Sequence, residues 1–124
     1  MQQSGVTYLE TIYLLSCQKE RVRAIDVANA LGYSKPSVSR AMGKLKAEGM
    51  LAETGNLDLV LSKEGLKKAK QLVEREELIA QFLMMTADVD EQTAQADAGA
   101  LAYHVSDKTF RGIKQFIKQV EEMN

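Results

Sequence analysis

The sequence predicts a mainly α-helical protein, in which a winged helix-turn-helix with a small two-strand wing precedes an all-helical dimerisation segment. Apolar residues recur at intervals of three and four over most of the 124 residues, which is the spacing of amphipathic helices. One short stretch, 57–61, alternates in the way a strand does. We expect residues 1–72 to form the winged helix-turn-helix domain and residues 73–124 to form the helical dimerisation domain.

Three helices are expected before residue 50. Residues 6–19 are apolar around nearly the whole circumference, which is typical of a buried helix. Residues 24–31 predict a short second helix that Gly32 ends. Pro36 fits the first turn of a third helix, which Ser34 is best suited to cap and which extends to about Glu48.

The second half of the chain begins with the wing. Leu57, Leu59 and Leu61 alternate with polar or outward residues, and 54–56 reads Thr-Gly-Asn, so we expect two short strands with a tip at 54–57. Ser62 then caps a long helix that ends near Met85. Two further helices are predicted, over about 91–105 and from Ser106 onward.

The composition excludes several functional classes. With 45% hydrophobic and 27% charged residues and no apolar run of about 20, we expect a cytoplasmic protein that contacts no membrane. The single Cys17 forms no internal disulfide, and a buried structural thiol is a simpler interpretation than a redox sensor. One His and no Gly-rich phosphate loop argue against an enzyme.

Charge is distributed unevenly along the chain. Residues 19–48 carry seven Lys or Arg against three Asp or Glu, whereas residues 74–124 carry five against ten. This asymmetry predicts that only the front half meets a polyanion, which we expect to be double-stranded DNA. The candidate DNA contacts on the third helix and the wing are Ser34, Lys35, Pro36, Ser37, Ser39, Arg40, Lys44, Lys46 and Asn56. The alternatives are a merely solvated helix face or a winged-helix module for protein interaction.

Six motifs resemble the diphtheria-toxin-repressor family of metalloregulators. They are YLETIYLL at 8–15, VANALGY at 27–33, PSVSRAMGKL at 36–45, LVLSKEG at 59–65, ELIAQFL at 77–83 and HVS at 104–106. The length resembles the short, manganese-transport-regulator branch. The resemblance implies a homodimeric regulator that binds a palindromic operator when Mn or Fe is plentiful.

The resemblance also assigns six metal-binding side chains, where this sequence departs from the family. The positions fall on Thr7, Glu10, Glu76, Gly99, Ala102 and Tyr103, where the usual residues are Asp, Glu, His, Glu, Glu and His. Only Glu10 matches, although the Glu76 carboxylate could still ligate. An oxygen-rich site needs about six donors, so we expect no cofactor and weakened or lost Mn and Fe sensing. The alternative is a functional repressor that binds Mn or Fe weakly through Glu10 and Glu76.

Two substitutes for the metal remain open. Tyr103 could fill the space, or Ala98, Gly99 and Ala102 could leave a pocket for an unknown small effector. Residues 78–85 and 107–120 carry more apolar surface than one thin helical layer can bury. This excess predicts a homodimer, in which a second copy covers the rest. The expected interface residues are Leu78, Phe82, Met85, Phe110 and Ile117.

Overall fold

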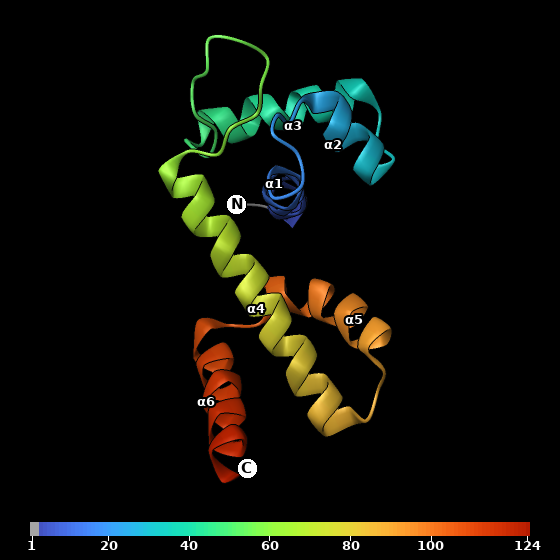
Figure 1. Ribbon diagram of the computed structural model, residues 1–124, viewed down its shortest axis with the longest axis vertical. Coiled ribbons are helices and arrows are strands. Elements are labelled where there is room, and N and C mark those ends of the chain that lie inside the picture. The colour runs from blue at the N-terminus through green and yellow to red at the C-terminus, as the bar shows by residue number, and fades with distance from the viewer. Residues whose placement is uncertain (1–2) are drawn as a thin grey trace. The chain divides into compact units, whose positions relative to one another are not determined.

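The computed structural model describes residues 3–124, which fold into six helices (Figure 1). They are α1 (Gln3–Ser16), α2 (Ala24–Leu31), α3 (Lys35–Ala47), α4 (Lys63–Ala87), α5 (Glu91–His104) and α6 (Asp107–Met123). The mainly helical fold class is therefore confirmed. The chain divides into two compact units, Met1–Gln71 and Leu72–Asn124. Residues 1 and 2 of the predicted first domain lie outside the described part. None of the described helices is long and apolar enough to cross a membrane.

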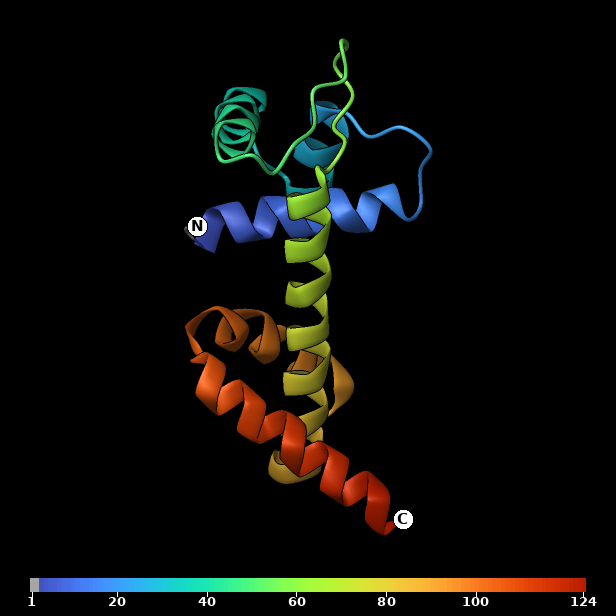
Figure 2. The same ribbon diagram turned by 90° about the vertical axis from the view of Figure 1, so that its left-hand side faces the viewer.

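In the first unit, α1, α2 and α3 pack around one apolar core, and Figure 2 shows how they cross. The core is made by residues from all three helices and from the loops that flank them. Its buried members are Tyr8, Ile12, Val22, Val27, Ala28, Val38, Met42, Leu45 and Leu51. Because residues 38, 42 and 45 follow the helical spacing, α3 turns one face into this core.

The first helix differs from its prediction in length and burial. It ends at Ser16 rather than at residue 19, and Leu14 is 44% exposed. Leu14 lies two residues after the fully buried Ile12, which places it about 200° further around the helix, away from the core. The exposed Cys17 follows the end of this helix, so the expectation of a buried thiol is wrong.

The expected two-strand wing is not formed as strands within residues 3–124. Residues 50–61 make a loop closed by one antiparallel bridge between Leu51 and Leu61. The amide of Leu59 donates to the carbonyl oxygen of Val22 at 2.7 Å, so the returning arm pairs partly outside the hairpin. At the tip, Asn56 Oδ1 accepts from the Asp58 amide at 2.9 Å. These local bonds take the place of a regular ladder.

The start of α4 is fixed by two close contacts with residues 49 and 50. The Ser62 hydroxyl accepts from the Gly65 amide at 3.0 Å and donates to the Gly49 carbonyl at 2.6 Å, which confirms Ser62 as the cap. The Gly65 backbone lies so close to Met50 that a Cβ there would overlap the Met50 carbonyl oxygen. A side chain at position 65 therefore cannot fit without moving the backbone.

In the second unit, α5 and α6 lie on either side of the second half of α4 (Figures 1 and 2). Ile79 and Ala80 of α4 pack against a buried row of alanines on α5, residues 94, 98 and 102. The side chains of Asp90 and Ser106 cap α5 and α6 by accepting from the amides of Thr93 and Thr109. The small residues thus bring two helices close together, and Ala98 and Ala102 are filled core positions rather than the walls of a pocket.

We predict that Gly65→Ala destabilises the protein by about 1–3 kcal/mol, because the added methyl meets a backbone carbonyl. Urea unfolding monitored by circular dichroism measures this change. Gly112→Ala in α6 is the matched control, since a Cβ there meets no atom within 4 Å. The control variant should be slightly more stable than the wild type, by about 0.5–1 kcal/mol. Equal effects of the two substitutions would contradict the prediction.

Candidate nucleic-acid interface

Residues 24–47 form two helices joined by a short turn. Gly32 ends α2 in the left-handed conformation at φ 70°, and its amide donates to the Ala28 carbonyl at 2.8 Å. Ser34 then caps α3 by accepting from the Ser37 amide at 3.3 Å, and Pro36 lies in the first turn. Glycine and serine at these two positions therefore set the sharp change of direction between the helices.

The two faces of α3 differ in polarity. Val38, Met42 and Leu45 are buried in the core of the first unit. The other positions on this helix are mostly exposed and carry four cations and three hydroxyl groups if Ser34 is counted with them. This helix therefore presents a polar, cationic surface, held in place by its own apolar side.

All nine predicted DNA contacts lie in the first unit, and eight of them belong to α3 and its cap. Ser37 is half-buried and the others are exposed. The Ser37 hydroxyl bonds to Ser34 Oγ at 2.9 Å and lies 3.4 Å from Nη2 of Arg40. Ser37, Arg40 and Lys44 border a hollow on the side of α3 that faces Ser4 and Gly5 of α1. The structure thus brings all the predicted residues except Asn56 onto α3 and its cap.

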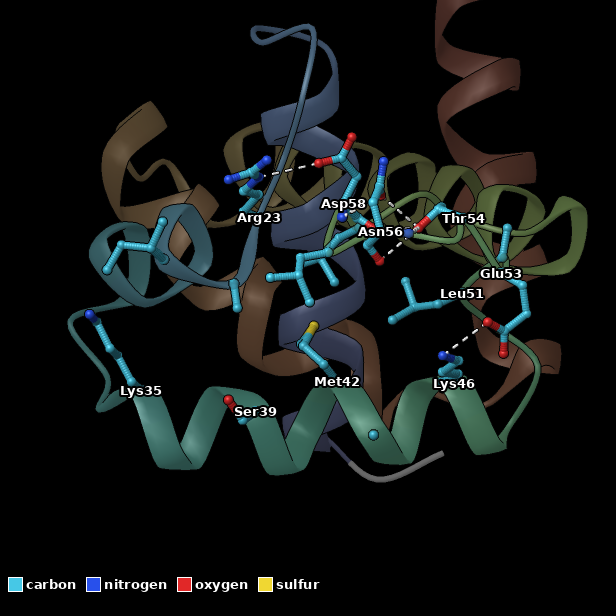
Figure 3. Close-up of a pocket in the computed structure, with 16 residues that line it drawn as sticks. Arg23, Lys35, Ser39, Met42, Lys46, Leu51, Glu53, Thr54, Asn56 and Asp58 are labelled. Carbon is cyan, nitrogen blue, oxygen red and sulfur yellow. Dashed lines mark hydrogen bonds and ion pairs between the residues drawn. The ribbon is translucent and has the colours of Figure 1, made fainter.

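A groove of about 500 Å³ lies between α3 and the 51–59 loop (Figure 3). We call it the α3 groove; Figure 3 shows Ser39, Met42 and Lys46 on the side of α3 that faces the loop, with Lys35 at the far end of the helix. Lys46 Nζ lies 3.1 Å from Glu53 Oε2, so this lysine is paired across the groove. An exposed pair of this kind stabilises by at most about 1 kcal/mol and exchanges readily for another anion.

The loop is tied to the rest of the unit by two arginines that are not among the predicted site residues. Arg21 forks onto Asp58 with donor–acceptor distances of 2.8 and 2.9 Å, and Arg23 Nε reaches the same carboxylate at 3.3 Å. Hydrogen bonds from Arg21 hold the pKa of Asp58 below its usual range, with Arg23 adding to the effect. The partners are 35 and 37 residues apart, so no local spacing could have paired them.

Asn56, the predicted contact at the tip of the loop, is exposed but partly engaged. Its Oδ1 atom bonds to the Thr54 hydroxyl and to the Asp58 amide, both at 2.9 Å. Neither of these bonds uses the Nδ2 amide group, which is a hydrogen-bond donor. Asn56 can therefore donate to a phosphate, but its acceptor is committed to the loop.

The six positions matched to metal ligands do not present the family's donor set. Thr7 and Glu10 lie on α1 of the first unit, whereas the other four belong to the second unit. Glu10 and Glu76 are half-buried, Tyr103 is partly exposed and packs edge to face on His104 at 5.1 Å, and Ala102 is buried in the core. Across residues 3–124 no group of three or more His, Cys, Asp or Glu side chains could hold a metal.

Four of the five expected interface residues remain partly accessible in a single chain. Met85 is exposed, and Leu78, Phe82 and Phe110 are half-buried. Ile117 is only 3% exposed, because it lies on the inner side of α6. The prediction that Ile117 lies in the dimer interface is therefore corrected, because almost none of its surface is left for a second copy to bury. The neighbouring Phe116 is exposed and packs edge to face on Phe82, with ring centroids 5.7 Å apart.

Two family models match almost the whole chain. Residues 3–57 match the iron dependent repressor, N-terminal DNA binding domain, and residues 62–123 match the iron dependent repressor, metal binding and dimerisation domain. Over 115 residues the chain is 35% identical to the HTH-type transcriptional regulator MntR of Lysinibacillus sphaericus and 34% identical to MntR of Bacillus subtilis. These matches cover 93% of this chain and 82% and 80% of the two relatives.

Solved structures agree with these matches. The manganese regulator SloR has a TM-score of 0.80 at 27% identity, and ScaR with bound Zn²⁺ has 0.80 at 25% identity. Each match covers 92% of this chain, which spans about half of each solved chain, 53%. The curated relatives are transcriptional regulators, which is consistent with the expectation of a protein that is not an enzyme.

The comparisons overturn one expectation. The donor count at the matched positions predicts no cofactor, but the family model that matches 62–123 describes a metal binding domain. The expectation rested on counting donors at six transferred positions, and a metal ion can complete its coordination with water. The small number of side-chain donors at these six positions therefore does not exclude a bound metal.

We predict that Asp58→Asn lowers the free energy of unfolding at neutral pH and that this difference shrinks in acid. The arginines lower the folded-state pKa of Asp58, so the carboxylate stabilises the fold above its unfolded pKa of about 3.9. That contribution is lost as pH falls through the folded-state pKa. Urea unfolding of both proteins between pH 7 and pH 3 measures it, and a difference that does not change with pH would contradict the role given to Asp58.

Proposed function

Because the chain belongs to the iron-dependent repressor family, we propose that it is a sequence-specific transcription regulator that places α3 in the major groove of DNA. The supporting observation is the exposed, cationic side of a helix whose apolar side is buried. Ser37, Ser39 and Arg40 in its first half are suited to base edges, since serine bonds to several bases and arginine forks onto guanine. Lys35, Lys44 and Lys46 are suited to phosphates.

We assign residues 1–72 to DNA binding and residues 73–124 to dimerisation. In this assignment residues 50–61, which we call the wing loop, act as the wing. Asn56 donates to the DNA backbone beside the groove that α3 enters. A phosphate can replace Glu53 as the partner of Lys46, because both are anions and the existing pair is exposed. A symmetric dimer presents two copies of α3, so we expect a palindromic operator whose half-sites are a whole number of helical turns apart.

We predict that replacing Arg40 and Lys44 together by Ala abolishes specific DNA binding at physiological salt. Both side chains are exposed on α3. Each phosphate contact that is lost lowers the slope of log affinity against log salt concentration by about one. Fluorescence anisotropy on duplexes selected by the wild-type chain from a random pool, at several salt concentrations, measures the effect. The control is Lys108→Ala with Lys118→Ala, which removes the same charge from α6. Equal losses in both double variants would reject α3 as the binding element.

We propose that the dimer interface includes Leu78, Phe82, Met85 and Phe116. These side chains retain accessible apolar surface in the second unit, where burial against a second copy would be favourable. Phe110 contributes less, because its ring already carries the Arg75 guanidinium at 4.9 Å.

We predict that Met85→Asp shifts the chain from dimer to monomer at micromolar concentration, because a carboxylate would be buried in the interface. Light scattering measures the mass, which should be twice that of the chain for the wild type. Leu57→Asp, which adds the same charge to the exposed tip of the wing loop, should remain dimeric. A monomeric wild type would contradict the proposed interface.

We further propose that the regulator responds weakly to a divalent metal, because the family model that matches residues 62–123 describes a metal binding domain; Glu10 and Glu76 are each a candidate ligand, as the carboxylates that remain at the matched positions. Oxygen donors suit Mn²⁺ and Fe²⁺, and water can supply the donors that Gly99 and Ala102 lack. Few protein ligands imply low affinity rather than tight binding.

We predict that Mn²⁺ binds with an affinity weaker than micromolar, and that Glu10→Gln and Glu76→Gln each weaken the binding. Isothermal titration calorimetry of the purified chain with MnCl₂ measures it. Asp97→Asn, an exposed carboxylate on α5, is the control and should bind as the wild type does. Binding that is unchanged in both glutamine variants would show that these two carboxylates are not ligands.

A further inference from the structure

Gly43 lies in the interior of α3, where glycine is unfavourable. The helix covers Lys35–Ala47, so eight residues precede this glycine and four follow it. An interior glycine weakens folding relative to alanine by roughly two- to fivefold in the folding equilibrium. The residue is therefore a cost to the fold unless something else requires it.

Nothing in the chain itself requires a glycine here. Its φ is not among the positive values of the described glycines, which are those of Gly32, Gly49 and Gly55. A Cβ built on Gly43 meets no atom within 4 Å, in contrast to Gly65, where a Cβ would meet the Met50 carbonyl. Neither the backbone conformation nor the packing of the unit explains its presence.

Gly43 does lie on the surface proposed to meet DNA. It lines the α3 groove together with Lys35 and Ser39, which precede it on the helix, and Lys46, which follows it. Arg40 and Lys44 border the hollow on the other side. The exposed side of α3 therefore carries cations near both ends of the helix, at Lys35 and Lys46, and beside the hollow, at Arg40 and Lys44. At position 43, between them, no side chain covers the backbone.

We propose that Gly43 is a positioning residue that lets the α3 backbone approach the DNA closely and so sets how deeply the helix enters the groove. Glycine serves in this way wherever a backbone must come close to a ligand. A methyl at this position would hold the helix away from the duplex, and Ser39 and Arg40, one turn earlier, would then miss their partners. This inference rests on the proposed DNA-binding function.

The test separates stability from binding. Gly43→Ala should raise the midpoint of thermal unfolding, as an interior helical alanine does, and should weaken binding to duplexes selected by the wild type by about tenfold or more. Gly43→Leu should weaken it further. Gly112→Ala, another helical glycine whose Cβ meets no atom within 4 Å, should raise the midpoint and leave DNA affinity unchanged.

Each outcome has a distinct meaning. If the wild type selects no duplex from a random pool, the proposed function fails before Gly43 is tested. If the wild type selects a duplex and Gly43→Ala binds it with equal affinity, the role of Gly43 is rejected and the proposed function stands. If Gly43→Ala is less stable than the wild type, the fold itself needs the glycine, and the inference is overturned.

Discussion

The burial of one side of α3 in the core of the first unit is the constraint on which the rest depends. Val38, Met42 and Leu45 cannot leave the core without exposing apolar surface, so the direction of the opposite side is fixed. A helix held in this way keeps most of its charged and hydroxyl side chains on the exposed side. The DNA-binding proposal follows from that division between the two sides of a single helix.

The wing loop shows a different way of fixing a functional segment. It lacks a regular ladder, and its position depends on a bridge at its base, a backbone bond to Val22 and the attachment of Asp58 to Arg21 and Arg23. Charged hydrogen bonds of this kind are stronger than neutral ones but remain partly exposed to solvent. The loop beside α3 therefore combines these polar contacts with the packing of Leu51, Leu59 and Leu61 on the core, whereas α3 is held mainly by apolar packing.

Local signals predicted the helices well because each rests on neighbours in the sequence. The caps at Ser34, Ser62 and Ser106, the glycine at position 32 and the three-and-four spacing all act within one or two turns. Contacts between distant segments could not be read in that way. The ties of Asp58, the inward orientation of Ile117, the exposure of Cys17 and the close approach of Gly65 to Met50 depend on the tertiary fold.

The central claim is that the polar side of α3 binds duplex DNA. The most direct measurement is amide hydrogen exchange, or the change in NMR chemical shifts, on adding a duplex selected by the full chain. The account predicts that the largest changes map to residues 34–46, with smaller ones at the wing loop. Changes confined to α5 and α6, with none on α3, would contradict it.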